Sequence, residues 1–211
     1  PLESAHTPNL DKLAAKSRLG YMYTIKEGIA PESDTATLAI LGNNPFKVYT
    51  GRGPLEAVGA DVKLTKDFIA FRANLSTVKG NKIIDRRVGR NLTTKEAISL
   101  SSAINKKVKL PYSFRFIPTI QHRAVLVIYK KLSPNISNTD PAYVKHDKLA
   151  IATTSNKLRP CKSIDSKKSS RLTANLVNSF SLQANAILND HPINKARKKR
   201  NNLPANYILL R

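Results

Sequence analysis

The sequence of 211 residues predicts an α/β fold, with α+β as the open alternative. Segments in which apolar side chains alternate, as in strands, are interspersed with segments in which they recur every three or four residues, as in helices. The longest helical pattern lies at 167–190, where Leu172, Leu176 and Phe180 begin one apolar face. Because 41% of the residues are hydrophobic, the chain has enough apolar side chains for a buried core and is not a disordered tail.

The first sixty residues contain three helix signals and one strand signal. A proline after a threonine cap predicts a helix that starts at residue 8. Residues 21–25 are expected to be a short strand. A buried helix is expected at 33–42, where it ends at a glycine. A glycine-rich turn at 51–54 precedes a short helix at 55–58.

Beyond residue 60 the pattern predicts a mixture of strands and helices. The expected strands are 67–73, 75–78, 82–85, 112–117, 123–129 and 206–210, and the expected helices are 94–105 and 167–190. The turn Lys79-Gly80-Asn81 between two strands is typical of a hairpin. The strand at 123–129 is apolar enough to be central, and the basic stretch at 195–200 is expected to be a loop.

The charge is distributed unevenly along the chain. Lys and Arg total 36 against 14 Asp and Glu, a formal charge of +22. Residues 1–60 carry six basic and six acidic side chains, whereas residues 61–211 carry 30 and 8. This split predicts two bodies and a polyanionic partner, with a solvated basic surface as the alternative. Nucleic-acid contacts are expected from the densest cluster, Lys195, Arg197, Lys198, Lys199 and Arg200. With 6% aromatic residues, backbone contact is favoured over base stacking.

Several protein classes are excluded by composition. The single cysteine, Cys161, rules out an internal disulfide and a zinc site built from cysteines. No apolar run reaches the roughly 18–20 residues that span a bilayer, and the first 17 residues have no signal-peptide pattern. A soluble cytoplasmic protein without a membrane partner is therefore expected.

Four short motifs are candidates for anion chemistry. Ser33-Asp34 starts an expected helix, where a serine either caps the helix or accepts a phosphoryl group at an end that favours anions. Gly51-Arg52-Gly53 suits either a phosphate or an ordinary turn. His122-Arg123 at a strand end suits either a carboxylate or phosphate, or a simple core histidine. Asp85-Arg86-Arg87 is either a surface ion pair or an anion clamp.

The order of these and further motifs along the chain carries a family resemblance. They are Thr7-Pro8-Asn9-Leu10-Asp11, Gly28-Ile29-Ala30-Pro31, Ser33-Asp34-Thr35-Ala36, Tyr49-Thr50-Gly51-Arg52-Gly53-Pro54, Ala70-Phe71-Arg72-Ala73-Asn74, Asp85-Arg86-Arg87, His122-Arg123-Ala124-Val125, Thr139-Asp140-Pro141 and His191-Pro192. Together they resemble the archaeal type of cofactor-independent phosphoglycerate mutase. The resemblance extends over essentially the whole chain.

This resemblance implies a partial alkaline-phosphatase-like core with a basic inserted α+β domain. The expected division is core at 1–60, inserted domain at 61–203 and a strand returning to the core at 204–211. The implied reaction is the glycolytic isomerisation of 3-phosphoglycerate to 2-phosphoglycerate through a phosphoserine. Ser33 would be the phosphoryl acceptor and a ligand of two divalent metal ions (Mn, Mg or Zn). The implied substrate-binding residues are Arg52, Arg72, Arg86, Arg87, Arg90, His122, Arg123 and Arg211.

The chain also departs from the family pattern. The Asp-Gly-Leu-Gly-Asp stretch expected before Pro1 and the metal ligands expected beyond Arg211 are absent, and Glu32 and Thr37 replace a glycine and a histidine. This chain alone is therefore expected not to bind the metals or to catalyse the reaction. The alternative prediction is an inactive mutase descendant that binds RNA or the ribosome. A partner chain covering an open edge of the core is a further expectation.

Overall fold

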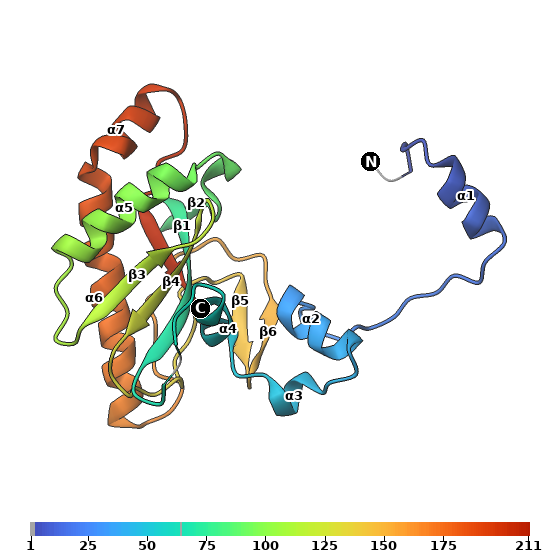
Figure 1. The fold of residues 1–211 in the computed structure, drawn as a ribbon, viewed down its shortest axis with the longest axis horizontal. Helices are drawn as coiled ribbons and strands as arrows, with labels where there is room; N and C mark the ends of the chain where they lie inside the picture. The colour runs from blue at the N-terminus through green and yellow to red at the C-terminus, as the bar shows by residue number, and fades with distance from the viewer. Residues whose placement is uncertain (1–2, 64) are drawn as a thin grey trace.

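A computed structural model describes residues 3–63 and 65–211 (Figure 1). The elements in chain order are α1 (Pro8–Ala15), α2 (Ser33–Ile40), α3 (Pro45–Val48), α4 (Arg52–Val58), β1 (Ile69–Lys79), β2 (Lys82–Asp85), a 3-10 turn (Val88–Arg90), α5 (Thr94–Lys107), β3 (Phe114–Pro118), β4 (Arg123–Ile128), β5 (Tyr143–His146), β6 (Leu149–Ala152), α6 (Lys168–Asp190), α7 (Pro192–Lys199) and β7 (Tyr207–Leu210). The predicted mixture of helices and strands, and with it the α/β class, is confirmed.

The main sheet is built around β1. Its order is β2-β1-β4-β3, and β7 also pairs with β1. Ala73 of β1 is opposite both Ala124 of β4 and Leu210 of β7, so these two strands flank β1 on opposite sides. The ladders between these strands are antiparallel. The predicted hairpin at Gly80 joins β1 to β2, and the two strands expected at 67–78 are one continuous strand.

The core lies between one face of this sheet and the helices α5 and α6. Alternation along β1 directs Phe71, Ala73 and Leu75 to this face, where all are buried. The rings of Phe116 of β3 and Phe180 of α6 pack against each other at a tilt, with centroids 5.7 Å apart. Helix α5 begins with a capping box, in which the side chains of its residues 93 and 96 bond each other's backbone amides.

Helix α4 packs on the opposite face of the sheet. Ala57 of α4 is buried against Ala70 and Val125. The contact requires Gly53, because a Cβ at this position would lie 2.0 Å from the carbonyl oxygen of Ala70. The backbone of α4 thus lies directly on β1, which fixes the position of the N-terminus of α4.

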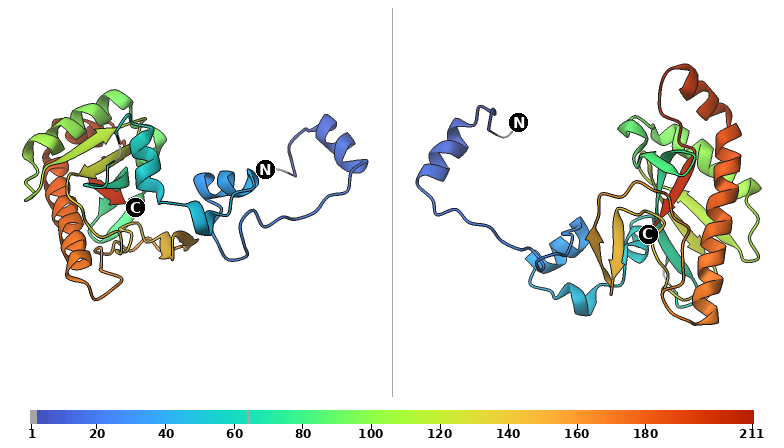
Figure 2. Two further views of the ribbon diagram at one scale, coloured as in Figure 1. Left: turned by 60° about the horizontal axis from the view of Figure 1, so that its bottom comes forward. Right: turned by 180° about the vertical axis from the view of Figure 1, so that it is seen from behind.

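The N-terminal arm differs from the sequence prediction. Helix α1 has no buried residue, and Figures 1 and 2 show that it and the following segment extend away from the sheet. The strand predicted at 21–25 is wrong: these residues are in no strand, and Tyr21, Met22 and Tyr23 are exposed. The helix expected to be buried at 33–42 is α2, but only Thr35 of it is buried. Apolar composition alone predicted burial, although no neighbouring element covers these side chains.

Two further segments differ from the prediction. The expected basic loop at 195–200 lies largely in helix α7, which His191 caps by accepting a hydrogen bond from the amide of Ile193 at 3.2 Å. The hairpin β5–β6 lies in a region without a sequence prediction, and its Ala150 carbonyl accepts a bond from Ala30 at 2.9 Å. Across the described part of the chain, the helices fall short of the length and apolar character needed to cross a membrane.

Candidate functional site

A cavity of about 210 Å³ lies where the N-termini of α2 and α4 meet β1 and the C-terminal end of β7. We call it the arginine cavity. Its lining consists of Glu32, Ser33, Arg52, Arg72, Asn74, Arg86, Arg87, Arg123, Asp140, Tyr143 and Arg211. The structure therefore brings together Ser33 and six of the eight residues expected to bind substrate.

Ser33 is the first residue of α2 and its side chain is exposed to the cavity. The N-cap of the helix is Glu32, and its side chain makes no capping hydrogen bond. The interpretation of Ser33 as the cap is therefore wrong, since Ser33 is already the first helical residue. The Oγ of Ser33 accepts a hydrogen bond from Nη2 of Arg52 at 3.4 Å. A guanidinium and the positive end of a helix dipole thus surround this hydroxyl.

Arg52 is positioned by acidic side chains on three sides. Its guanidinium lies 3.3 Å from Asp34, 3.2 Å from Glu56 and 3.7 Å from Glu32. Asp34 also accepts a hydrogen bond from Tyr49 at 2.5 Å. Burial, and secondly this bond, raise the pKa of Tyr49, which therefore stays a hydrogen-bond donor.

Arg211 is held by an acidic and an aromatic side chain. Its Nη1 lies 2.6 Å from Oε1 of Glu32, and its guanidinium carbon lies 3.9 Å from the centre of the Tyr143 ring. The ion pair and the cation–π contact are both largely buried, with 10% of the Arg211 side chain exposed. Glu32 therefore places an internal carboxylate inside the arginine cavity.

Arg72 is the most deeply buried cation of the cavity, at 7% exposure. Burial, and then the charges of Arg52 and Arg211, lower its pKa to about 10, so it is still charged at neutral pH. Its Nε lies 3.7 Å from Glu56 and has no hydrogen bond within the described part of the chain.

The remaining three arginines of the cavity differ in their partners. Arg86 bonds Asp140 at 2.8 Å, the Asn156 side chain at 2.5 Å and the carbonyl of residue 155 at 2.7 Å. Its donors are therefore largely used within the protein. Arg87 and Arg123 line the cavity, but their guanidinium groups have no hydrogen-bond or ion-pair partner among residues 3–63 and 65–211. These two are free to bind an external anion.

Two predicted substrate-binding residues lie outside the lining. Arg90 is exposed at the end of the 3-10 turn after β2, with φ of 56°, and is not part of the cavity wall. His122 is buried at 7% exposure, and burial and then the charges of Arg123, Arg72 and Arg87 lower its pKa to about 4. A neutral histidine behind the arginines does not itself neutralise an anion, so His122 supports the wall rather than lining it.

The cluster expected to bind nucleic acid is divided between surface and interior. Lys195, Lys198, Lys199 and Arg200 are exposed on or just after α7. Arg197 is 4% exposed and pairs with Glu96 at 3.0 Å, which joins α7 to α5. The inclusion of Arg197 in a basic surface is therefore wrong, because the helical period turns this residue inward.

The described residues do not fit the two divalent metals. Nowhere in residues 3–63 and 65–211 do three or more His, Cys, Asp or Glu side chains come together as metal ligands. The carboxylates next to Ser33 are those of Glu32 and Asp34, and both are engaged by arginine or tyrosine. We therefore derive no step through a metal for these residues.

Three polar residues of the lining, Asn74, Asp140 and Tyr143, were not predicted as site residues, although the first two lie in motifs of the family resemblance. Asn74 follows Arg72 by two positions on the same strand, so the alternation of side chains across a strand placed both on one face. Asp140 and Tyr143 lie in a segment for which the sequence predicted no element, and only its folding beside β7 brings them to the cavity. Thr139 joins this segment to β7 by two hydrogen bonds: its amide donates to the Leu210 carbonyl at 3.0 Å, and its Oγ1 accepts from the Leu210 amide at 2.7 Å.

Comparison with known proteins identifies the family. The family model for 2,3-bisphosphoglycerate-independent phosphoglycerate mutase matches residues 14–194. Relatives of that name from Aeropyrum pernix and Methanopyrus kandleri are 44% and 39% identical, over 100% of this chain but only 52% and 49% of theirs. The structure of a cofactor-independent phosphoglycerate mutase from Thermoplasma acidophilum matches with a TM-score of 0.64 and 35% identity, over 100% of this chain and 53% of that one.

The chain thus spans about half the length of the relatives that it matches. None of these three proteins is named for RNA or ribosome binding, so the alternative prediction has no support. The resemblance noted in the sequence, and the fold class it implied, are confirmed. The chain belongs to the 2,3-bisphosphoglycerate-independent phosphoglycerate mutase family.

Proposed function

We propose that this chain forms the substrate-binding and phosphoryl-accepting part of a phosphoglycerate mutase. The substrate is 3- or 2-phosphoglycerate, and its binding site is the arginine cavity. The observation that carries this proposal is the convergence of Arg72, Arg87 and Arg123 beside Ser33 without full internal neutralisation. The named activity of the relatives supports it.

The charge of the cavity favours a small multivalent anion. Six arginines line it against two carboxylates, those of Glu32 and Asp140. Asp140 is paired with Arg86, and Glu32 with Arg211. Arg52 is paired with three carboxylates as well. The guanidinium groups of Arg72, Arg87 and Arg123 match the phosphate and carboxylate of one phosphoglycerate, because a planar fork can donate two parallel hydrogen bonds to such groups.

Ser33 is suited to accept the phosphoryl group. In the proposed step Oγ of Ser33 gives up its proton and bonds to phosphorus while the bond from phosphorus to the substrate oxygen breaks, and that oxygen takes up the proton and becomes a hydroxyl. Transfer of the phosphoryl group back to the other hydroxyl completes the isomerisation. Arg52 donates to the attacking oxygen, and the cavity arginines stabilise charge on the transferred group.

The rest of the catalytic centre lies outside what the described residues provide. In this proposal the inserted domain at 61–203 supplies most of the arginines, while segment 1–60 supplies Ser33 and Arg52 and segment 204–211 supplies Arg211. A glycolytic role places the protein in the cytoplasm. The chain by itself is expected to bind phosphoglycerate without multiple turnover.

Calorimetric titration tests the proposal. The 211-residue chain is expected to bind 3-phosphoglycerate in a one-to-one ratio and to bind glycerate at least tenfold more weakly, because one charge-assisted contact to phosphate is worth about tenfold or more in affinity. Equal binding of phosphoglycerate and glycerate, or no saturable binding, would contradict it.

Arg87 and Arg90, which are both exposed and lie three positions apart, provide a matched pair of variants. Arg87→Ala removes a guanidinium from the cavity, whereas Arg90→Ala removes the same charge from the outer surface. Arg87→Ala is expected to weaken phosphoglycerate binding by about tenfold or more, and Arg90→Ala by less than about twofold. Equal losses would show attraction by overall charge rather than by this cavity.

A further inference from the structure

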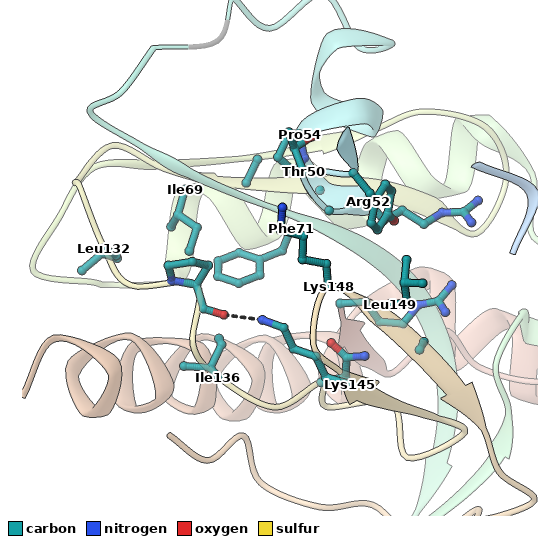
Figure 3. Close-up of a pocket in the computed structure, with 18 of the residues that line it drawn as sticks. Thr50, Arg52, Pro54, Ile69, Phe71, Leu132, Ile136, Lys145, Lys148 and Leu149 are labelled. Atoms are coloured by element: carbon teal, nitrogen blue, oxygen red, sulfur yellow. Dashed lines mark hydrogen bonds between the residues drawn. The ribbon is translucent and has the colours of Figure 1, made fainter. Parts of the chain in front are cut away.

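A second and larger cavity adjoins the arginine cavity (Figure 3). Its volume is about 350 Å³, and it shares Glu32, Arg52 and Arg211 with the arginine cavity as a common wall. We call it the apolar cavity. The phosphoglycerate binding proposed above takes place in the arginine cavity and does not involve the remaining walls of the apolar cavity.

The wall away from the shared residues is mainly apolar. It is made by Phe68, Ile69, Phe71, Leu132, Ile136 and Leu149. In Figure 3 the ring of Phe71 lies between Ile69 and Ile136, so side chains from β1 and from the loop after β4 form one continuous apolar surface. A ligand with an apolar body several carbons long matches this surface.

Two lysines introduce positive charge into this apolar wall. The Nζ of Lys145 donates to the carbonyl of Pro134 at 2.7 Å, and that of Lys148 donates to the carbonyl of Lys47 at 3.2 Å. Neither amine has a carboxylate partner among the residues that the structure describes. Because an ammonium has three donors, each lysine keeps hydrogen-bonding capacity for an anion.

The burial of Lys145 favours an anionic partner for its ammonium group. Its side chain is half-buried, and burial lowers its pKa. An anion that enters the cavity with its tail on Phe71 therefore offsets part of the cost of that burial by pairing with the ammonium. Arg211 does not compete for this role, because it is already paired with Glu32.

We propose that the apolar cavity binds a small carboxylate with an apolar tail, whose head group contacts Lys145 and whose tail packs on Ile69, Phe71 and Ile136. The cavity volume lies at the lower end of the range for ligand sites, which fits a medium-chain or arylalkyl carboxylate rather than a long lipid. The inference is independent of phosphoglycerate binding, since it rests on another cavity and other side chains.

Octanoate is a suitable probe for the unmodified chain. In a titration followed by amide NMR shifts, octanoate is expected to bind saturably and to shift β6 and the first residues of β1. Octanol tests the charge and acetate tests the tail, and each is expected to bind at least tenfold more weakly. If octanol binds as tightly as octanoate, or if the shifts occur on α1 instead, the proposal is wrong.

Two variants and one control locate the site. Lys145→Gln is expected to weaken octanoate binding about tenfold, and Leu132→Trp is expected to abolish it by filling the half-buried rim of the cavity. Lys95→Gln removes an exposed lysine from α5, outside the cavity, and is expected to change nothing. Octanoate affinity that is the same in Lys145→Gln and Lys95→Gln, or unchanged in Leu132→Trp, overturns the proposal.

Discussion

The carboxylate of Glu32 and the guanidinium of Arg211 form an ion pair of 2.6 Å across 179 positions of sequence. Glu32 precedes the candidate phosphoryl acceptor Ser33, and Arg211 follows the last strand of the sheet. The pair therefore joins the two segments that meet at the arginine cavity. Because Arg211 is paired with Glu32, its positive charge is partly neutralised within the protein, next to Ser33.

Glu32→Gln is expected to strengthen phosphate binding by about tenfold, because it removes the carboxylate that competes for Arg211 and Arg52. The measurement is a calorimetric titration with inorganic phosphate. Glu27→Gln, at an exposed position outside the cavity, is the charge-matched control and is expected to have little effect. Weaker phosphate binding in Glu32→Gln would show that the pair organises the cavity rather than competing with the ligand.

Gly53→Ala is expected to destabilise the protein by about 2 kcal/mol and to weaken phosphate binding. The new Cβ would lie 2.0 Å from the Ala70 carbonyl oxygen, which forces α4 and the adjacent Arg52 away from β1. Urea unfolding gives the stability. Gly20→Ala serves as the control, because its Cβ meets no atom within 4 Å. Equal stability of the two variants would show that α4 does not pack as described.

His122 is expected to make the folded protein less stable as the pH falls. Its folded pKa of about 4 lies below the ordinary value of 6.5, so the unfolded chain binds the proton more readily between these values. The stability present above pH 6.5 is therefore lost progressively as the pH falls towards 4. From about pH 7 to about pH 5 this amounts to about 2 kcal/mol.

The His122→Gln variant separates this titration from others, including that of His191, whose pKa burial also lowers. Its free energy of unfolding is expected to fall by about 2 kcal/mol less than that of the original protein over the same interval. Parallel pH profiles for the two proteins would mean that His122 does not titrate as its burial next to Arg72, Arg87 and Arg123 requires.

Arg197→Ala is expected to cost about 3 kcal/mol or more of stability, because it leaves Glu96 without its buried partner and empties the contact between α5 and α7. Lys198→Ala changes an exposed neighbour and is expected to change stability by less than about 0.5 kcal/mol. Thermal unfolding of both variants makes the comparison. If Arg197→Ala leaves the stability unchanged, Arg197 is not a buried structural residue and belongs to the basic surface predicted from the sequence.

Local patterns predicted most of the central fold. The alternating strand at 67–73, the hairpin glycine at 80 and the long apolar face of α6 each depend on neighbours in sequence. The structure contains the hairpin and α6, and the strand is the first part of β1. The strand expected at 21–25 is absent because a strand also needs a pairing partner, which a short sequence window does not contain. The loop expected at 195–200 is wrong for a similar reason, since the cap at His191 and the buried Asn194, both outside that stretch, stabilise α7.

Four short motifs indicated anion chemistry at separate places in the sequence, and the family resemblance joined them into one candidate site. Ser33 and Arg211 are distant in sequence, and only the resemblance placed them together. The same resemblance included Arg90 and His122, which the fold places on the outer surface and behind the wall. Glu32 was noted as an anion beside the serine, but its pairing with Arg211 required the structure.

A crystal structure of the chain with bound 3-phosphoglycerate tests the central claim most directly. The account predicts that the phosphate lies in the arginine cavity, bonded by Arg72, Arg87 and Arg123, with its phosphorus facing the Oγ of Ser33. A phosphate bound instead on the exposed face of α7, or in the apolar cavity beside Lys145, would contradict it.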